Sequence, residues 1–217
     1  MVLADRRPRP ARRPGRPRGG GLVADRAQLL AAAERLIRSQ GPGVTMEAVA
    51  AEAAVTTPIL YRTVGDKDAL AEALAEVLVD RVNAAVTAAV VGAADEREGF
   101  RRFVAAYFGQ VEAHRDLYLF VTGGATGDDG LTRALRLADR SAVPLAARLA
   151  EQRAAAGLDP AAARVWAYGV IGALHFVTLS WLRDAAGGPD ETARHITELL
   201  WSGLAPAGST ERTIRAR

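Results

Sequence analysis

The stretch that decides the fold runs from Thr45 to Lys67 and reads TMEAVAAEAAVTTPILYRTVGDK. Two short segments with apolar residues at helical spacing flank a break at residues 53–55, and a threonine precedes each segment at the position of an N-cap. In the first segment Val49 and the small Ala50 face the second segment, so the two helices can cross closely. This pattern predicts a helix-turn-helix arrangement.

The second of these helices presents a polar outer face. That face carries Thr56, Thr57, Tyr61 and Arg62, whose hydroxyls and guanidinium can bond phosphates and base edges in the major groove of DNA. Tyr61 has a second interpretation, as a half-buried aromatic side chain that closes the small domain. The residue types therefore favour a DNA-reading helix without fixing the role of each side chain.

At these residues the chain resembles the TetR family of one-component transcriptional regulators. The shared features, in chain order, are an apolar helix that ends at Gly41, a helix started by Thr45, the pair Val49-Ala50, the segment Glu52-Ala53-Ala54-Val55, the hydroxyl-rich run Thr56-Thr57-Pro58-Ile59-Leu60-Tyr61, and then Lys67 and Leu70. The resemblance covers about residues 24 to 72. Ala54 stands where the family has a turn glycine, and Val64 stands where it has an aromatic residue. If the turn requires a positive φ, an alanine there costs about 1 kcal/mol.

The resemblance also implies a fold and a set of DNA contacts. The fold is all-α: a three-helix helix-turn-helix domain followed by a larger helical domain that binds a small effector and forms a homodimer through its last two long helices. The implied phosphate contacts are Thr45, Thr56, Tyr61 and Lys67, and the implied base contacts are Thr57, Pro58 and Arg62. A dimer follows from function as well, because one recognition helix reads too few base pairs for useful selectivity. We therefore expect a ligand-responsive repressor of a palindromic operator.

The N-terminal arm is strongly basic. Residues 1–18 hold seven arginines and one aspartate, a charge of +6, so the rest of the chain carries −3 of the net +3. Within the arm, Arg13 to Gly19 reads RPGRPRG and resembles an AT-hook, in which prolines keep the backbone extended along a narrow A·T-rich minor groove. The alternative is a disordered tail with non-specific, salt-dependent affinity for DNA. Under either reading Arg16 and Arg18 strengthen DNA binding.

The remainder of the chain is predicted to be helical. Expected helices cover residues 24–40, 67–91, 97–113, 131–156, 160–186 and 190–204, with a short apolar run at 117–121, a loop at 127–130, and Pro144 kinking or dividing its helix. No alternating pattern predicts a strand. The expected organisation is a disordered basic arm (1–21), the helix-turn-helix domain (22–66), the effector-binding and dimerisation domain (67–204) and a flexible tail (205–217).

Two features of the larger part bear on ligand and partner binding. The candidate pocket residues are aromatic or polar side chains at helical spacing: Phe103, Tyr107, Tyr118, Phe120, Trp166 and His175. Their alternative role is plain core packing. Since their helix faces hold few charges, an apolar or aromatic effector is favoured over a polyanion. Small residues at Gly169, Gly172 and Ala173, with an apolar patch at residues 199–201, are the candidate dimer surfaces.

The composition argues against several other classes of protein. There is no cysteine, the three histidines His114, His175 and His195 lack metal-ligand spacing, and no phosphate loop or nucleophile motif follows a strand, so we expect no metal, no cofactor and no enzyme. Residues 165–182 are uncharged but are expected to form a buried helix of a cytoplasmic protein rather than a membrane span. The remaining alternative is an architectural A·T-rich DNA-binding protein dominated by its basic arm.

Overall fold

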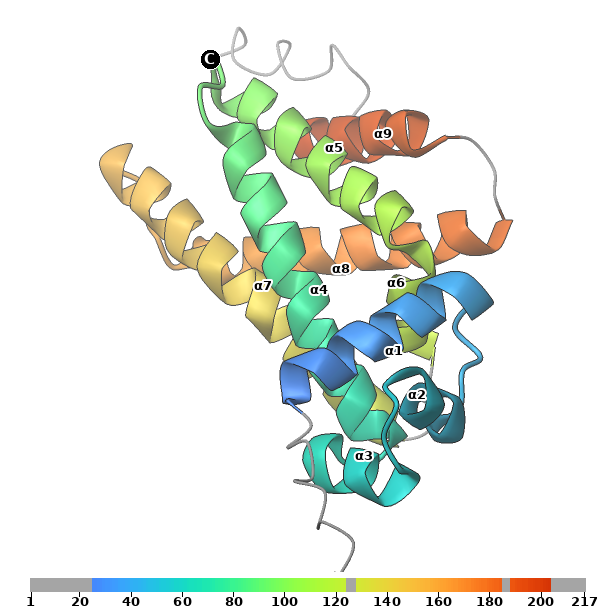
Figure 1. The fold of residues 1–217 in the computed structure, drawn as a ribbon. Coiled ribbons are helices and arrows are strands. Elements are labelled where there is room, and N and C mark those ends of the chain that lie inside the picture. The colour runs from blue at the N-terminus through green and yellow to red at the C-terminus, as the bar shows by residue number, and fades with distance from the viewer. Residues whose placement is uncertain (1–24, 124–127, 185–187, 204–217) are drawn as a thin grey trace, which may run out of the picture.

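The computed structural model of the chain describes residues 25–123, 128–184 and 188–203, and these residues are helical and without strands (Figure 1). The basic arm with Arg16 and Arg18 and the C-terminal tail lie outside the described residues. The helices are α1 (Arg26–Gln40), α2 (Met46–Glu52), α3 (Thr57–Val64), α4 (Lys67–Val90), α5 (Glu96–Ala113), α6 (Arg115–Gly123), α7 (Asp128–Ala155), α8 (Ala162–Asp184) and α9 (Pro189–Ser202). The all-α prediction is confirmed.

The three N-terminal helices form a small bundle whose ends follow local sequence signals. Asp25 caps α1 by accepting a hydrogen bond from the Ala27 amide at 3.1 Å, and Gly41 ends the helix at φ +82°, a conformation that favours glycine. Leu29, Ala33 and Ile37 recur along one face of α1 and are buried. These side chains provide the surface on which α2 and α3 pack.

Helix α4 joins the small bundle to the rest of the molecule, as Figure 1 shows. Asp66 caps it through a 2.8 Å hydrogen bond from the Ala69 amide. Leu70 and Leu74 near its start and Val86 near its end are all buried. At 24 residues α4 is about 36 Å long, given the rise of 1.5 Å per residue. A single helix therefore contributes to the core at both ends.

The larger part is built around α4. Helices α4 and α5 pack along each other, α7 and α8 form a helical hairpin, and α9 lies on α5 (Figure 1). Residues 162–183 of α8 form a helix that is long and apolar enough, by length and composition, to cross a membrane. Here that helix packs against α7 and α9, and Ala167, Leu174 and Thr178 are buried. Only 28% of its most apolar stretch is buried, and Val165 and Phe176 are exposed, so the expectation of a buried helix holds for one face alone.

Three predicted boundaries differ from the structure. Residues 128–130 form the first turn of α7 rather than a loop. The helix begins three residues before the apolar pattern that predicted it. Pro144 does not divide α7: the proline removes one backbone donor, but packing along α8 holds the helix on both sides of that position. Helix α8 begins at Ala162, because the carboxylate of Asp159 caps a turn at the Ala161 amide before the helix starts.

Candidate DNA-binding face and effector cavity

The turn between α2 and α3 is tight and carries a backbone strain. Thr45 caps α2, with its hydroxyl accepting from the Ala48 amide at 3.3 Å. The Val55 amide donates to the Ala50 carbonyl at 3.0 Å and closes the turn. Ala54 lies between them at φ +53°, which is the only positive φ of a non-glycine residue in the described part of the chain. The turn does need the conformation that glycine supplies in the family.

Helix α3 is anchored on one side and open on the other. Leu60 is fully buried and Val64 nearly so, which fixes α3 on the small bundle. The residues expected to meet DNA lie outward: Thr45, Thr56, Pro58, Tyr61, Arg62 and Lys67 are exposed, and Thr57 is half-buried. Thr56 precedes α3 but its side chain makes no capping hydrogen bond, so its hydroxyl is not used within the helix. The structure thus brings all seven side chains of the motif to the surface.

Gly65 and Lys67 shape the end of this face. Gly65 ends α3 at φ +96°, and a Cβ built there would lie 2.7 Å from the Cβ of Ala69, so only glycine fits. The ammonium of Lys67, at the start of α4, lies 5.7 Å from the centre of the Phe120 ring. This cation–π contact ties the expected phosphate-binding lysine to α6.

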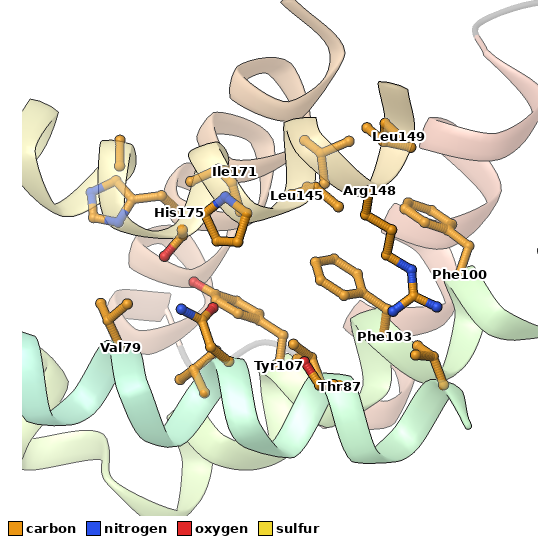
Figure 2. A pocket seen from close by; sticks show the side chains of 18 of the residues that line it. Val79, Thr87, Phe100, Phe103, Tyr107, Leu145, Arg148, Leu149, Ile171 and His175 are labelled. Atoms are coloured by element: carbon orange, nitrogen blue, oxygen red, sulfur yellow. The ribbon is translucent and has the colours of Figure 1, made fainter. Parts of the chain in front are cut away.

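A cavity of about 860 Å³ lies in the larger part, away from the DNA-binding face. It is lined by α4, α5, α6, α7 and α8, with Trp201 of α9 at its edge, and its walls are mainly apolar. Figure 2 shows Phe100, Phe103 and Tyr107 of α5 facing Leu145 and Leu149 of α7 across it. A volume of this size suits a small organic molecule.

Four of the six predicted pocket residues line this cavity and two do not. Phe103, Tyr107, Tyr118 and His175 are lining residues. Phe120 is buried next to Lys67 instead, because two residues along a helix turn the side chain by about 200° from Tyr118. Trp166 lies nine residues before His175, on the opposite side of α8, where its half-exposed ring packs under Arg153 at 4.3 Å. Both expectations for the pocket are corrected accordingly.

A chain of hydrogen bonds joins the polar side chains at one wall of the cavity. The hydroxyl of Thr178 donates to the Tyr107 hydroxyl at 3.2 Å, the two tyrosine hydroxyls are 3.5 Å apart, and the Tyr118 hydroxyl is 2.7 Å from Nδ1 of His175. Burial raises the pKa of both tyrosines and lowers the pKa of His175, since each charged form loses hydration. The cluster is therefore uncharged at neutral pH.

The part of the cavity near Phe100 carries charged side chains that sequence reasoning missed. Arg148 of α7 extends toward Phe103 and Phe100 in Figure 2. Asp95 and Glu96, next to each other at the start of α5, also line the cavity. The signal that could have found Arg148 is the spacing of α7: Ser141, Leu145, Arg148 and Gln152 recur at four, three and four residues on one face. In the described residues no three histidine, aspartate or glutamate side chains gather where they could hold a metal ion.

Comparison with known proteins decides the family. Residues 29–74 match the model of bacterial regulatory proteins of the tetR family, and residues 85–216 match that of the tetracyclin repressor-like C-terminal domain. The two ranges together span the helix-turn-helix, the cavity and α9. This chain belongs to the TetR family of transcriptional regulators.

Relatives of this TetR family regulator support the assignment. Uncharacterized HTH-type transcriptional regulators of two Mycobacterium tuberculosis strains are 28% identical to it, over 89% of this chain and 84% of theirs. A Rhodococcus sp. RHA1 protein of unknown function is 26% identical, with a TM-score of 0.62 over 87% of this chain and 98% of its own. The Bacillus subtilis regulator FadR, solved in complex with stearoyl-CoA, shares the fold at 14% identity and a TM-score of 0.66, over 83% of this chain and 100% of its own.

The family assignment establishes the general function of the protein. TetR family proteins are DNA-binding transcription regulators with a helix-turn-helix, and the family is one of regulators rather than of enzymes. Its members are typically dimers that respond to small molecules. In this regulator the candidate DNA-binding helix is α3, and the candidate ligand-binding site is the cavity.

Proposed function

We propose that this regulator is a repressor that binds a palindromic operator as a dimer and is released by a small effector with an apolar or aromatic body. The observation that carries the proposal is the combination in one chain of an exposed, hydroxyl-rich α3 and a largely apolar cavity of about 860 Å³. An effector that binds one conformation of the dimer better than another shifts the DNA affinity by that difference.

The proposed DNA contacts divide into two groups by their place on the face. Thr45, Thr56, Tyr61 and Lys67 would bind phosphates and fix the register, and Thr57, Pro58 and Arg62 would face bases. A guanidinium bonded to a guanine discriminates against the wrong base by about 1–3 kcal/mol. The arm residues Arg16 and Arg18 would add affinity, in the minor groove or along the phosphates.

The proposed dimer surface lies on α8. Val165 and Phe176 are exposed apolar side chains eleven residues apart, and Gly169 and Gly172 lie between them with open space where a Cβ would be. These positions recur at four, three and four residues and so share one face of the helix. Exposed apolar residues beside small ones allow close approach of a second copy of α8.

The experiment is a selection of bound duplexes from a randomised DNA pool at moderate salt. We expect a palindrome whose half-sites are about one helical turn, or a multiple of it, apart. Arg62→Ala is expected to relax the preference at one base position in each half-site, whereas Arg97→Ala, an exposed arginine on α5, is expected to leave the selected site unchanged.

Other outcomes of the selection point to different functions. Recovery of A·T-rich tracts without symmetry would replace the proposal by the architectural one, in which the basic arm dominates. No enrichment of any site would contradict the repressor proposal. With an operator in hand, a screen for compounds that release it tests the second half of the proposal, and stearoyl-CoA is a reasonable member of the screen given the FadR complex.

A further inference from the structure

The hydrogen-bond chain at the cavity wall admits two directions, and the first runs from Thr178 to His175. Thr178 is fully buried and donates to Tyr107, which leaves the Tyr107 proton for the Tyr118 hydroxyl. Tyr118, once it accepts from Tyr107, has its own proton for Nδ1 of His175. This order makes a hydrogen bond of every contact. The second direction, in which Nδ1 of His175 donates to Tyr118 and Tyr118 donates to Tyr107, does so as well, and the two differ in which proton faces the cavity.

The first direction sets the tautomer of His175. Burial lowers the pKa of this imidazole, so it is neutral at neutral pH and carries one proton. With Nδ1 accepting from Tyr118, that proton is on Nε2. His175 is a lining residue of the cavity, and among the described residues no hydrogen bond to its Nε2 is found. In this direction the chain ends in an N–H donor at the wall of a mainly apolar cavity.

We propose that the cavity contains a hydrogen-bonding subsite in which His175 Nε2–H donates to an oxygen acceptor of the effector. This inference rests on the proposed function, because it describes the ligand of the same cavity. The class of effector it specifies has an apolar body and a carbonyl or comparable acceptor oxygen placed where the body meets Tyr118 and His175. Thr178, Tyr107 and Tyr118 are positioning residues, since they act through the histidine.

The subsite makes the cavity selective for oxygenated molecules. Around the cluster the walls are aliphatic, with Val79 of α4 and Val121 of α6 among the lining residues. A purely hydrocarbon ligand that fills this space would leave the N–H of His175 without an acceptor. An unsatisfied donor costs more free energy than the hydrogen bond contributes when it forms. A ketone of the same shape satisfies the donor and keeps the apolar contacts.

The test compares two probes that differ only at the oxygen. Dodecan-2-one and 2-methyldodec-1-ene have the same skeleton, with C=O in the first where the second has C=CH₂. Each is titrated against the full-length protein preloaded with 1-anilinonaphthalene-8-sulfonate, a dye that reports apolar sites. We expect the ketone to displace the dye at a concentration at least about fivefold lower than the alkene does.

Two variants test whether the preference for the ketone arises at the hydrogen-bond chain. Tyr118→Phe removes the donor to Nδ1 and is expected to reduce the ketone preference to near one, while the dye still binds. Tyr168→Phe is the matched control: Tyr168 also lines the cavity from α8, but its hydroxyl bonds Asp139, so the preference is expected to persist. A merely structural role for Tyr118 would lower the affinity for both probes alike.

A second measurement does not depend on any variant. ¹⁵N chemical shifts of the imidazoles, assigned among only three histidines, are expected to show Nδ1 of His175 unprotonated and Nε2 protonated at neutral pH. A proton on Nδ1 would reverse the direction of the chain and overturn the inference.

The outcomes separate this inference from the proposed function. Equal displacement by ketone and alkene overturns the subsite but leaves an apolar effector cavity intact. A protein that binds neither dye nor probes loses the cavity function, and the subsite with it. A ketone preference that survives His175→Phe, which removes the Nε2–H donor, also overturns the subsite.

Discussion

Ala54 stores backbone strain at the centre of the DNA-reading motif. At φ +53° an alanine side chain crowds its own backbone, at a cost of about 1–2 kcal/mol relative to glycine. Part of that cost is offset because alanine loses less chain entropy on folding. Ala54→Gly is therefore expected to raise the free energy of unfolding by about 0.5–1 kcal/mol, measured by urea denaturation.

The control for Ala54 is its neighbour Ala53, which ends α2 with a helical φ of −81°. Ala53→Gly is expected to destabilise the protein by about 0.5–1 kcal/mol, because glycine there gains nothing from the backbone conformation. Equal changes in the free energy of unfolding for the two substitutions would contradict backbone strain at Ala54. Operator affinity, measured in parallel, would show whether the relaxed turn still positions α3.

At the scale of elements, an ion pair joins α1 to α4. Arg81 donates two hydrogen bonds to the carboxylate of Glu34, one of them 2.7 Å long, and this contact holds the pKa of Glu34 below its usual value of 4.5. A lowered pKa in the folded state means that the stabilisation is present above pH 4.5 and is lost as the pH falls through the folded-state pKa.

Glu34→Gln is expected to reduce the free energy of unfolding at pH 7 by about 1 kcal/mol, a figure that takes into account solvent screening of the half-exposed Arg81. At pH 3 the difference between variant and wild type should shrink. The control is Glu76→Gln, which breaks the more exposed pair with Arg140 of α7 and should cost less than about 0.5 kcal/mol. A difference at Glu34 that does not change with pH would contradict the assigned role.

The elements were predictable from local signals, whereas the cavity was not. Caps at Thr45 and Asp66 and the glycine after α1 marked the helix ends beside them, because a cap acts within one turn of its own residue. The prediction for Phe120 and Trp166 is wrong, because aromatic residues at helical spacing do not show which face of a helix meets the cavity. Arg148 was missed because its role depends on the packing of α7 across from α5.

At the scale of the whole molecule, the proposed dimer depends on one exposed face of α8. Val165 on α8 and Val91 after α4 are almost equally exposed, at 73% and 72%, but only Val165 lies on the face that holds Gly169 and Gly172. Val165→Glu is expected to raise the dissociation constant of the proposed dimer at least about tenfold, because it would place a charge in the proposed apolar contact. Val91→Glu should leave the dimer intact, as measured by sedimentation equilibrium.

If both variants sediment alike, the α8 face is not the dimer surface. If Val165→Glu yields a folded monomer, its operator affinity should fall steeply, since each half-site is then read alone. Circular dichroism of the monomer distinguishes lost pairing from lost folding.

The short helix α6 touches both functional regions. Tyr118 faces the hydrogen-bond chain of the cavity, and Phe120, on the opposite side of the same helix, lies against the Lys67 ammonium at the DNA-binding face. Movement of α6 in response to an occupant of the cavity therefore reaches the lysine directly. If an effector weakens operator binding as proposed, thermodynamic linkage requires that operator DNA weaken effector binding by the same factor. A regulator bound to its operator would then need a higher effector concentration than one free in solution.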